Sequence, residues 1–388
     1  MEHWGAPAPI PLGDPGRWWL APRRMFDGHA FHADVALLIE DGHVASISPA
    51  ASAGADGAPV WHSDHLLVPG YVDLQINGGG GRLFNTDPTP EGLAVIARAH
   101  RQSGTTALLP TLITDAPEVL DRAVAAMLAA IGHNGIVGIH IEGPHISIER
   151  KGAHKPDFIR PFDQRTMDAV TKLRQAGVPV LLTLAPECAP AGTITALVRM
   201  GAVVSLGHTA ADAATVRMAI AEGARSVTHL FNAMTPMTSR EPGVVGAAID
   251  SAVYCGIIAD GHHVDDAMFR LACRARPMAG RMVLVSDAMP TWAGPDSFEL
   301  YGETIRLKDG RLVNTIGSLA GVHIDIAKSV ARIVRDIGLP LDQALRMATS
   351  TPAELMGLDG IGVLRPGVAL NAILIDQALD PAAVFARA

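Results

Sequence analysis

The sequence predicts an α/β fold: a (β/α)8 TIM-like barrel with a small β-sandwich domain formed from the N- and C-terminal segments. Two observations lead to this prediction. Strand-like apolar runs alternate with helix-like segments through the middle of the 388-residue chain, and both ends of the chain carry strand patterns. Strands that alternate with helices pair in parallel, and eight such units close into a barrel.

The two ends of the chain are expected to build the small β-domain. Residues 1–17 are rich in Pro and Gly and are expected to form a loose extension. In the next segment, 36–40 and 43–47 flank Asp41-Gly42, which is a strong hairpin signal. The last residues become strand-like again after Arg365-Pro366-Gly367. We therefore assign 18–67 plus 356–388 to the β-domain and 68–355 to the barrel.

The barrel region contains eight strand-like runs, at about 71–76, 105–112, 137–142, 179–185, 203–208, 226–230, 254–259 and 282–287. The segments between them have helical spacing at 91–103, 118–131, 164–176, 194–200, 211–222 and 265–275. After the eighth run we expect a hairpin of 298–307 with 311–313, then helices at about 322–337 and 340–348. An open, doubly wound sheet is the structural alternative, but it would not bring residues from so many strands together.

Composition limits the class of protein and its partners. With 48% hydrophobic and 18% charged residues the chain is globular. The net charge of −8 argues against nucleic acid and against an anionic membrane as partners. No apolar run reaches the ~20 residues that span a bilayer. Cys188, Cys255 and Cys273 lie far apart, as in a protein of a reducing compartment, and we see no signal peptide. We therefore expect a cytoplasmic protein.

Four predicted strands end on a residue that can bind a metal or move a proton: Glu142, His208, His229 and Asp287. One carboxylate and two imidazoles form a catalytic zinc set that leaves one coordination position open. We predict one divalent metal ion per subunit, with Zn²⁺ as the expected ion, although other divalent metals suit the same ligands. Asp287 is then the natural proton carrier for the attacking water. A single His at a strand end is usually only hydrogen-bonded. The prediction of a metal-dependent hydrolase therefore depends on all four residues occurring together.

Several motifs, in this order, resemble the amidohydrolase superfamily, and within it the family of N-acetylglucosamine-6-phosphate deacetylases. They cover roughly residues 68 to 321 and read Pro69-Gly70-Tyr71-Val72-Asp73, His140-Ile141-Glu142-Gly143-Pro144, Lys151-Gly152-Ala153-His154, Gly207-His208-Thr209, Thr228-His229-Leu230-Phe231-Asn232-Ala233-Met234, Arg240-Glu241-Pro242-Gly243, Asp260-Gly261-His262-His263-Val264 and Ser286-Asp287-Ala288. The resemblance implies hydrolysis of the acetamide of N-acetyl-D-glucosamine 6-phosphate, with Asp287 as general base and then general acid. The alternatives are a deacetylase for the galactosamine epimer or another amidohydrolase. A non-catalytic scaffold is disfavoured because the whole Glu/His/His/Asp set is present.

The resemblance also implies which residues bind the phosphorylated N-acetyl amino sugar. His154 would contact the scissile amide, and Arg240 with His263 would hold the 6-phosphate in a pocket shared across a homodimer interface. The remaining pocket residues would be Ala153, Asn232, Ala233 and Leu319. Many superfamily members carry His-x-His on the first strand, whereas this chain has Gln75-Ile76-Asn77. This departure indicates the one-metal branch, with Gln75 either near a second metal or hydrogen-bonded behind the first.

Overall fold

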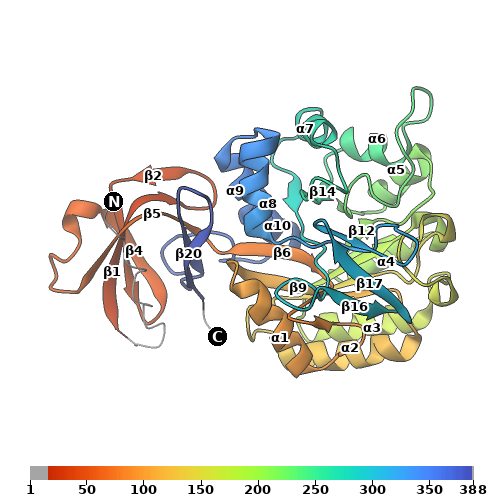
Figure 1. Ribbon diagram of the computed structural model, residues 1–388, viewed down its shortest axis with the longest axis horizontal. Coiled ribbons are helices and arrows are strands. Elements are labelled where there is room, and N and C mark those ends of the chain that lie inside the picture. Colours follow the sequence, from red (N-terminus) through yellow and green to blue (C-terminus); the bar gives the residue numbers. More distant parts are fainter. Residues whose placement is uncertain (1–15, 387–388) are drawn as a thin grey trace.

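The structure is a computed structural model that describes residues 16–386. Figure 1 shows a β-sheet at one end of the long axis, containing the first strands and the last one, and a barrel at the other end. The loose extension expected at 1–17 falls mostly outside the described residues. Its last residue, Arg17, already belongs to a strand.

The sheet at the end of the long axis has seven strands: β1 (Arg17–Phe26), β2 (Phe31–Ala33), β3 (Val35–Glu40), β4 (His43–Pro49), β5 (Val60–Pro69), β19 (Ala372–Ile375) and β20 (Pro381–Phe385). Their order is β20-β19-β5-β1-β3-β4, with β2 paired to β1. The β3–β4 hairpin turns through Asp41 and Gly42, both at positive φ, as that dipeptide predicts. Because β19 pairs with β5, both ends of the chain contribute to one sheet.

All eight predicted barrel strands are confirmed: β6 (Tyr71–Ile76), β9 (Thr105–Ile113), β10 (Ile139–Glu142), β11 (Val180–Leu184), β12 (Val203–Leu206), β13 (Ser226–Val227), β14 (Tyr254–Ile257) and β15 (Met282–Leu284). They form one parallel sheet in the order of the sequence. Between the two end strands, the backbone N–H of Asp287 donates to the carbonyl of Gln75 at 2.9 Å, and Ile76 forms a single bridge with Ala288. The barrel therefore closes at the level of Asp287.

Helices cover the outside of the barrel: α1 (Pro90–Arg101), α2 (Pro117–Ala130), α3 (Gln164–Gln175), α4 (Thr193–Arg199), α5 (Ala213–Ala221), α6 (Gly243–Ile249) and α7 (Asp266–Arg274). Six of them match predicted helices. The seventh, α6, was not predicted, because all seven of its residues are buried and no polar face marks a helical period. Short elements between these are η1 (Ala50–Ser52), β7 (Gly78–Gly79), β8 (Arg82–Leu83), η2 (Ile148–Arg150), η3 (Pro156–Phe158) and η4 (Pro186–Cys188).

The segment after the barrel strands differs from the prediction in two places. The expected strand 298–307 is two strands, β16 (Ser297–Leu300) and β17 (Glu303–Lys308), because Tyr301 and Gly302 turn at positive φ; β18 (Arg311–Val313) completes a three-stranded sheet. The helix expected from 322 begins later, as α8 (Ile326–Arg332), because the side chain of Asp325 caps it through the Lys328 N–H. It continues into η5 (Ile333–Ile337), α9 (Leu341–Ala348) and the unpredicted α10 (Ser350–Met356).

Among the described residues, no helix combines the length and the apolar character that crossing a bilayer requires.

Candidate metal centre and substrate cavity

The backbone at the strand ends turns the functional side chains toward the barrel axis. β10 ends at Glu142 and is followed by Gly143 at φ +79°. His208, His229 and Asp287 each lie two or three residues beyond the end of their strand and have φ of 48°, 29° and 51°. Residues other than Gly are uncommon in this left-handed region and cluster at functional sites. The local strain therefore coincides with the residues that the sequence singles out.

Glu142, His208 and His229 converge on one point. Oε1 of Glu142 lies 3.2 Å from Nε2 of His208 and 3.1 Å from Nε2 of His229, and the two Nε2 atoms are 3.0 Å apart. Ligands bonded at ~2.0–2.1 Å to a tetrahedral ion are roughly 3.3 Å from one another. All three side chains are buried. The donor set and its spacing fit one divalent metal ion.

The second ring nitrogen of His208 explains why a cation is needed here. Nδ1 lies 2.9 Å from the carbonyl oxygen of Arg150, so Nδ1 carries the proton and Nε2 presents a lone pair. That lone pair faces the Glu142 carboxylate and the Nε2 of His229. Three electron-rich atoms at this spacing repel one another unless they share a positive charge.

Electrostatics keep the carboxylate of this set ionised. Burial would raise the pKa of Glu142, but its interactions with the neighbouring imidazoles of His208 and His229 hold it well below its ordinary value. For His229, burial acts to lower the pKa, and the hydrogen bond to Glu142 outweighs it and raises the pKa. An ionised carboxylate is the form that binds a metal.

Asp287 lies beside this set and is held by two amide side chains. Nε2 of Gln75 donates to Oδ1 of Asp287 at 3.1 Å and to both carboxylate oxygens of Glu142 at 3.2 Å. Nδ2 of Asn77 donates to the same Oδ1 of Asp287 at 2.6 Å. Gln75 therefore lies beside the metal-binding set as a hydrogen-bond donor to both carboxylates.

Burial raises the pKa of Asp287 to about 6, and the charge of Glu142 adds to the rise. A carboxyl group with such a pKa can take up and return a proton near neutral pH. Behind it, Oδ1 of the fully buried Asp73 accepts the backbone N–H groups of Gln75 and Ser286 at 3.1 and 3.3 Å. The Asp73 carboxyl thus joins β6 to the segment that carries Asp287.

His154 comes from the long connection after β10 and lies against the metal set. Its ring centroid is 4.4 Å from that of His208, and its Nδ1 lies 2.7 Å from Oγ1 of Thr114. Burial lowers the pKa of His154 to about 3. The imidazole is therefore neutral at physiological pH.

His263 is held by the carboxylate of Asp260. Oδ2 of Asp260 lies 2.6 Å from Nδ1 of His263, and Oδ1 accepts the backbone N–H groups of His262 and His263, both at 2.9 Å. Burial acts to raise the pKa of Asp260, but these hydrogen bonds and the charge of His263 lower it to about 2. The bonded Nδ1 leaves the Nε2 edge of His263 available to a ligand.

These residues surround one cavity of about 230 Å³, lined by Asn77, Ile113, Glu142, Gly152, Ala153, His154, His208, His229, Asn232, Ala233, Ile258, His263, Asp287, Met289, Leu319 and Gly321. It contains every predicted site residue except Gln75, which lies behind the carboxylates, and Arg240. The side chain of Arg240 is exposed on the connection between β13 and α6 and does not line the cavity of its own chain. Neither Arg nor Lys is among the described residues that line it.

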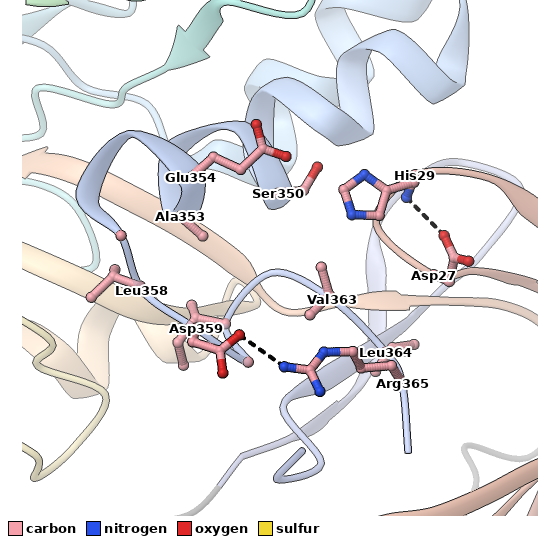
Figure 2. Close-up of a pocket in the computed structure, with 13 residues that line it drawn as sticks. Asp27, His29, Ser350, Ala353, Glu354, Leu358, Asp359, Val363, Leu364 and Arg365 are labelled. Carbon is pink, nitrogen blue, oxygen red and sulfur yellow. Dashed lines mark hydrogen bonds and ion pairs between the residues drawn. The ribbon is translucent and has the colours of Figure 1, made fainter. Parts of the chain in front are cut away.

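A larger cavity, of about 440 Å³, lies between the β1–β2 connection and the end of α10. Figure 2 shows that its charged groups pair locally: Asp359 with Arg365, and Asp27 with the backbone of His29. Glu354 and Ser350 project from α10 on the other side. Among the described residues no metal-binding set converges there, so this cavity has no chemistry comparable to the barrel rim.

The sequence analysis gave no role to Asn77, Thr114 or Asp260. Asn77 could have been found, because it is two residues after Gln75 and such residues of a strand share a face. Asp260 is three residues before His263, a spacing typical of a side chain that accepts local backbone N–H groups. Thr114 gave no signal, since nothing in the sequence relates it to His154.

Comparisons with known proteins agree with this architecture. A model of the Amidohydrolase family matches residues 66–387. The N-acetylgalactosamine-6-phosphate deacetylase of Shewanella sp. (strain ANA-3) is 41% identical over 348 residues, 88% of each chain. The N-acetylglucosamine-6-phosphate deacetylase of Haemophilus influenzae is 33% identical over 345 residues, 87% of this chain and 90% of that one. The crystal structure of N-acetylglucosamine-6-phosphate deacetylase from Pasteurella multocida matches with a TM-score of 0.88 at 32% identity, covering 94% of this chain and 97% of that chain.

Proposed function

This chain belongs to the amidohydrolase family, and we propose that it hydrolyses the acetamide of N-acetyl-D-glucosamine 6-phosphate to glucosamine 6-phosphate and acetate. The observation that carries the proposal is the convergence of Glu142, His208 and His229 beside the buried Asp287. The names of the Haemophilus and Pasteurella relatives support the substrate.

Zn²⁺ is the ion we expect at Glu142, His208 and His229, because one carboxylate and two imidazoles are a zinc donor set. Such an ion, when bound, polarises an acyl carbonyl and lowers the pKa of water. Asp287 takes the proton of the attacking water and passes it to the amine nitrogen, which then leaves as a neutral amine. Gln75 and Asn77 occupy Oδ1 of Asp287. Within the described part of the chain Oδ2 has no hydrogen bond, so Oδ2 is the oxygen that moves the proton.

We assign the phosphate end of the cavity to His263 and Arg240. The Asp260 carboxylate holds Nδ1 of His263, so that the ring can present Nε2 to a phosphate oxygen in the cavity. A planar guanidinium matches a phosphate dianion by two parallel hydrogen bonds. Asn232 and Ala233 follow β13, the neighbour of the strand that precedes His263, and suit contacts to sugar hydroxyls. Ala153 and Leu319 line the same cavity.

A homodimer is the simplest way to bring Arg240 to a phosphate. Arg240 is exposed, and its own cavity has no Arg or Lys among the described lining residues. In a two-fold dimer the same loop of each subunit can reach the other subunit. We therefore propose that Arg240 completes the phosphate pocket of the partner subunit.

The galactosamine epimer is the second candidate substrate, because the Shewanella relative named for it is 41% identical to this chain. Both substrates share the acetamide and the 6-phosphate and differ only at one hydroxyl group. The residues assigned above do not discriminate between them.

A reducing cytoplasm is the location we expect. Cys188, Cys255 and Cys273 are all free thiols, as is usual where disulfides do not form.

Acetate release tests the function directly. The protein is dialysed against a chelator, reloaded with Zn²⁺, and assayed on N-acetylglucosamine and N-acetylgalactosamine, each with and without the 6-phosphate. We expect release only after metal loading and chiefly from the phosphorylated sugars, with the kcat/KM ratio naming the epimer. If the metal-loaded protein releases acetate from none of the four compounds, the proposed function is wrong.

A further inference from the structure

Thr114 connects three parts of the cavity wall. It directly follows β9 and is buried. Its Oγ1 lies 2.7 Å from Nδ1 of His154 and 3.4 Å from the backbone oxygen of Glu142. Its own carbonyl accepts the hydroxyl of Tyr301, at the turn between β16 and β17. Thr114 thus contacts the loop of His154, the strand that bears a metal ligand, and the added sheet.

The hydrogen bond between Thr114 and His154 has two possible directions. The two directions place the ring proton on different nitrogens, because a neutral imidazole carries a proton on only one of its two ring nitrogens. If Nδ1–H donates to Thr114, the Nε2 that remains is a bare acceptor. If the Thr114 hydroxyl donates to Nδ1, the proton of the ring is on Nε2. Within residues 16–386 no hydrogen bond to Nε2 of His154 is found, and the ring lines the cavity.

Distance and chemistry favour donation from the Thr114 hydroxyl to Nδ1 of His154. The Thr114 hydroxyl has one proton to donate, and two neighbouring atoms could accept it: Nδ1 of His154 at 2.7 Å and the backbone oxygen of Glu142 at 3.4 Å. The His154 nitrogen is 0.7 Å closer. A bare lone pair on Nε2 would repel the oxygen of an acyl group, whereas an N–H group there stabilises the charge that develops on it.

We propose that Thr114 is a positioning residue: its hydroxyl donates to Nδ1 of His154 and thereby keeps a proton on Nε2, directed at the acyl carbonyl of the substrate. This inference rests on the proposed amide hydrolysis. The hydrogen bond at one ring nitrogen determines whether the other nitrogen carries the proton, as it does for histidines that bind metals.

Isosteric replacement tests the inference. Thr114→Val removes the hydroxyl with little change of shape and should lower kcat roughly 10- to 100-fold, the range for losing a partner of an active-site histidine. KM and bound metal should stay near wild type, because Thr114 is neither among the described residues that line the cavity nor one of the three expected metal ligands. Thr114→Ser keeps the hydroxyl and should restore most of kcat. The matched control is Thr105→Val, at the start of β9, the strand that Thr114 follows, since Thr105 is buried and its hydroxyl has no partner in the described part of the chain.

Nitrogen NMR of His154 in the Zn²⁺-loaded wild-type protein gives a readout that needs neither a variant nor activity. We expect the proton on Nε2 in wild type and in Thr114→Ser, and a changed tautomer ratio in Thr114→Val. A wild-type proton on Nδ1, or a Thr114→Val enzyme with wild-type kcat, would overturn the inference. Failure of the wild type to release acetate would instead refute the proposed function, while the NMR result would still report the tautomer.

Discussion

The two ends of the cavity differ in how completely one chain builds them. At the metal end, Glu142, His208 and His229 are buried and lie within 3.2 Å of one another. At the other end, His263 is held by Asp260, but Arg240 is exposed and outside the cavity. The strand ends position the three metal-binding side chains within one chain, whereas the connection that carries Arg240 leaves its side chain on the surface.

Removing the metal should inactivate the metal end of the cavity. We expect dialysis against a chelator to abolish acetate release and to lower the thermal midpoint, because a ligand bound only to the folded state at 1,000 times its Kd adds about 4 kcal/mol. Metal analysis, calorimetry and activity are measured before and after adding Zn²⁺ back. Full activity in a preparation free of metal would contradict the assignment of the three ligands.

Asp287→Asn should also abolish catalysis at the metal end, but the metal ion should stay bound. The carboxamide cannot accept a proton, and loss of a general acid–base group typically costs ~10²–10⁴-fold in rate. Metal content and substrate affinity, measured by calorimetry, should remain. A turnover within tenfold of wild type would remove Asp287 from the mechanism.

Arg240→Ala tests phosphate recognition at the His263 end of the cavity. We expect a loss of ~2–5 kcal/mol in kcat/KM for the phosphorylated sugar, the range for truncating one partner of a buried charge pair. The unphosphorylated sugar should be nearly unaffected. Arg217→Ala removes another exposed arginine, on α5, and serves as the control. Equal losses on both sugars would contradict phosphate recognition.

Mixing variants shows which subunit provides Arg240. Arg240→Ala and Asp287→Asn chains are unfolded, combined in equal amounts and refolded. If Arg240 acts across a two-fold interface, half of the dimers are mixed and each has one intact site, giving about a quarter of wild-type activity. If it acts in its own subunit, no site in the mixture is complete and activity stays low.

The smallest effect is expected for Asp260→Asn. The folded-state pKa of Asp260 is about 2, below its ordinary value, so its carboxylate stabilises the fold above pH ~4 and loses this contribution as the pH falls toward 2. The shift corresponds to about 2 kcal/mol in the free energy of unfolding. Unfolding in urea at pH 7 and at pH 3 should show the variant destabilised at pH 7, with a smaller difference at pH 3. An equal difference at both pH values would contradict this linkage.

Much of the architecture could be predicted because it repeats in the sequence. The eight strands were found from apolar runs, and parallel pairing then follows from the helices between them. Elements without such a signal were missed or misplaced: α6 is buried on every side, and the turn at Tyr301 and Gly302 interrupts what reads as one strand. Their structure depends on packing that a local pattern does not contain.

The sequence by itself determined the barrel, the strand-end positions of Glu142, His208, His229 and Asp287, and the absence of a histidine pair on the first barrel strand. The spacing of apolar residues and the identity of the residue that ends each strand-like run are local properties of the sequence, so they can be predicted without the structure. Only the tertiary structure decided which groups hold these residues: Gln75 and Asn77 on Asp287, Asp260 on His263 and Thr114 on His154. It also left Arg240 outside the cavity of its own chain. Hydrogen bonds between Thr114 and His154, or between Asn77 and Asp287, join residues far apart in sequence, and closure of the barrel alone brings them within reach.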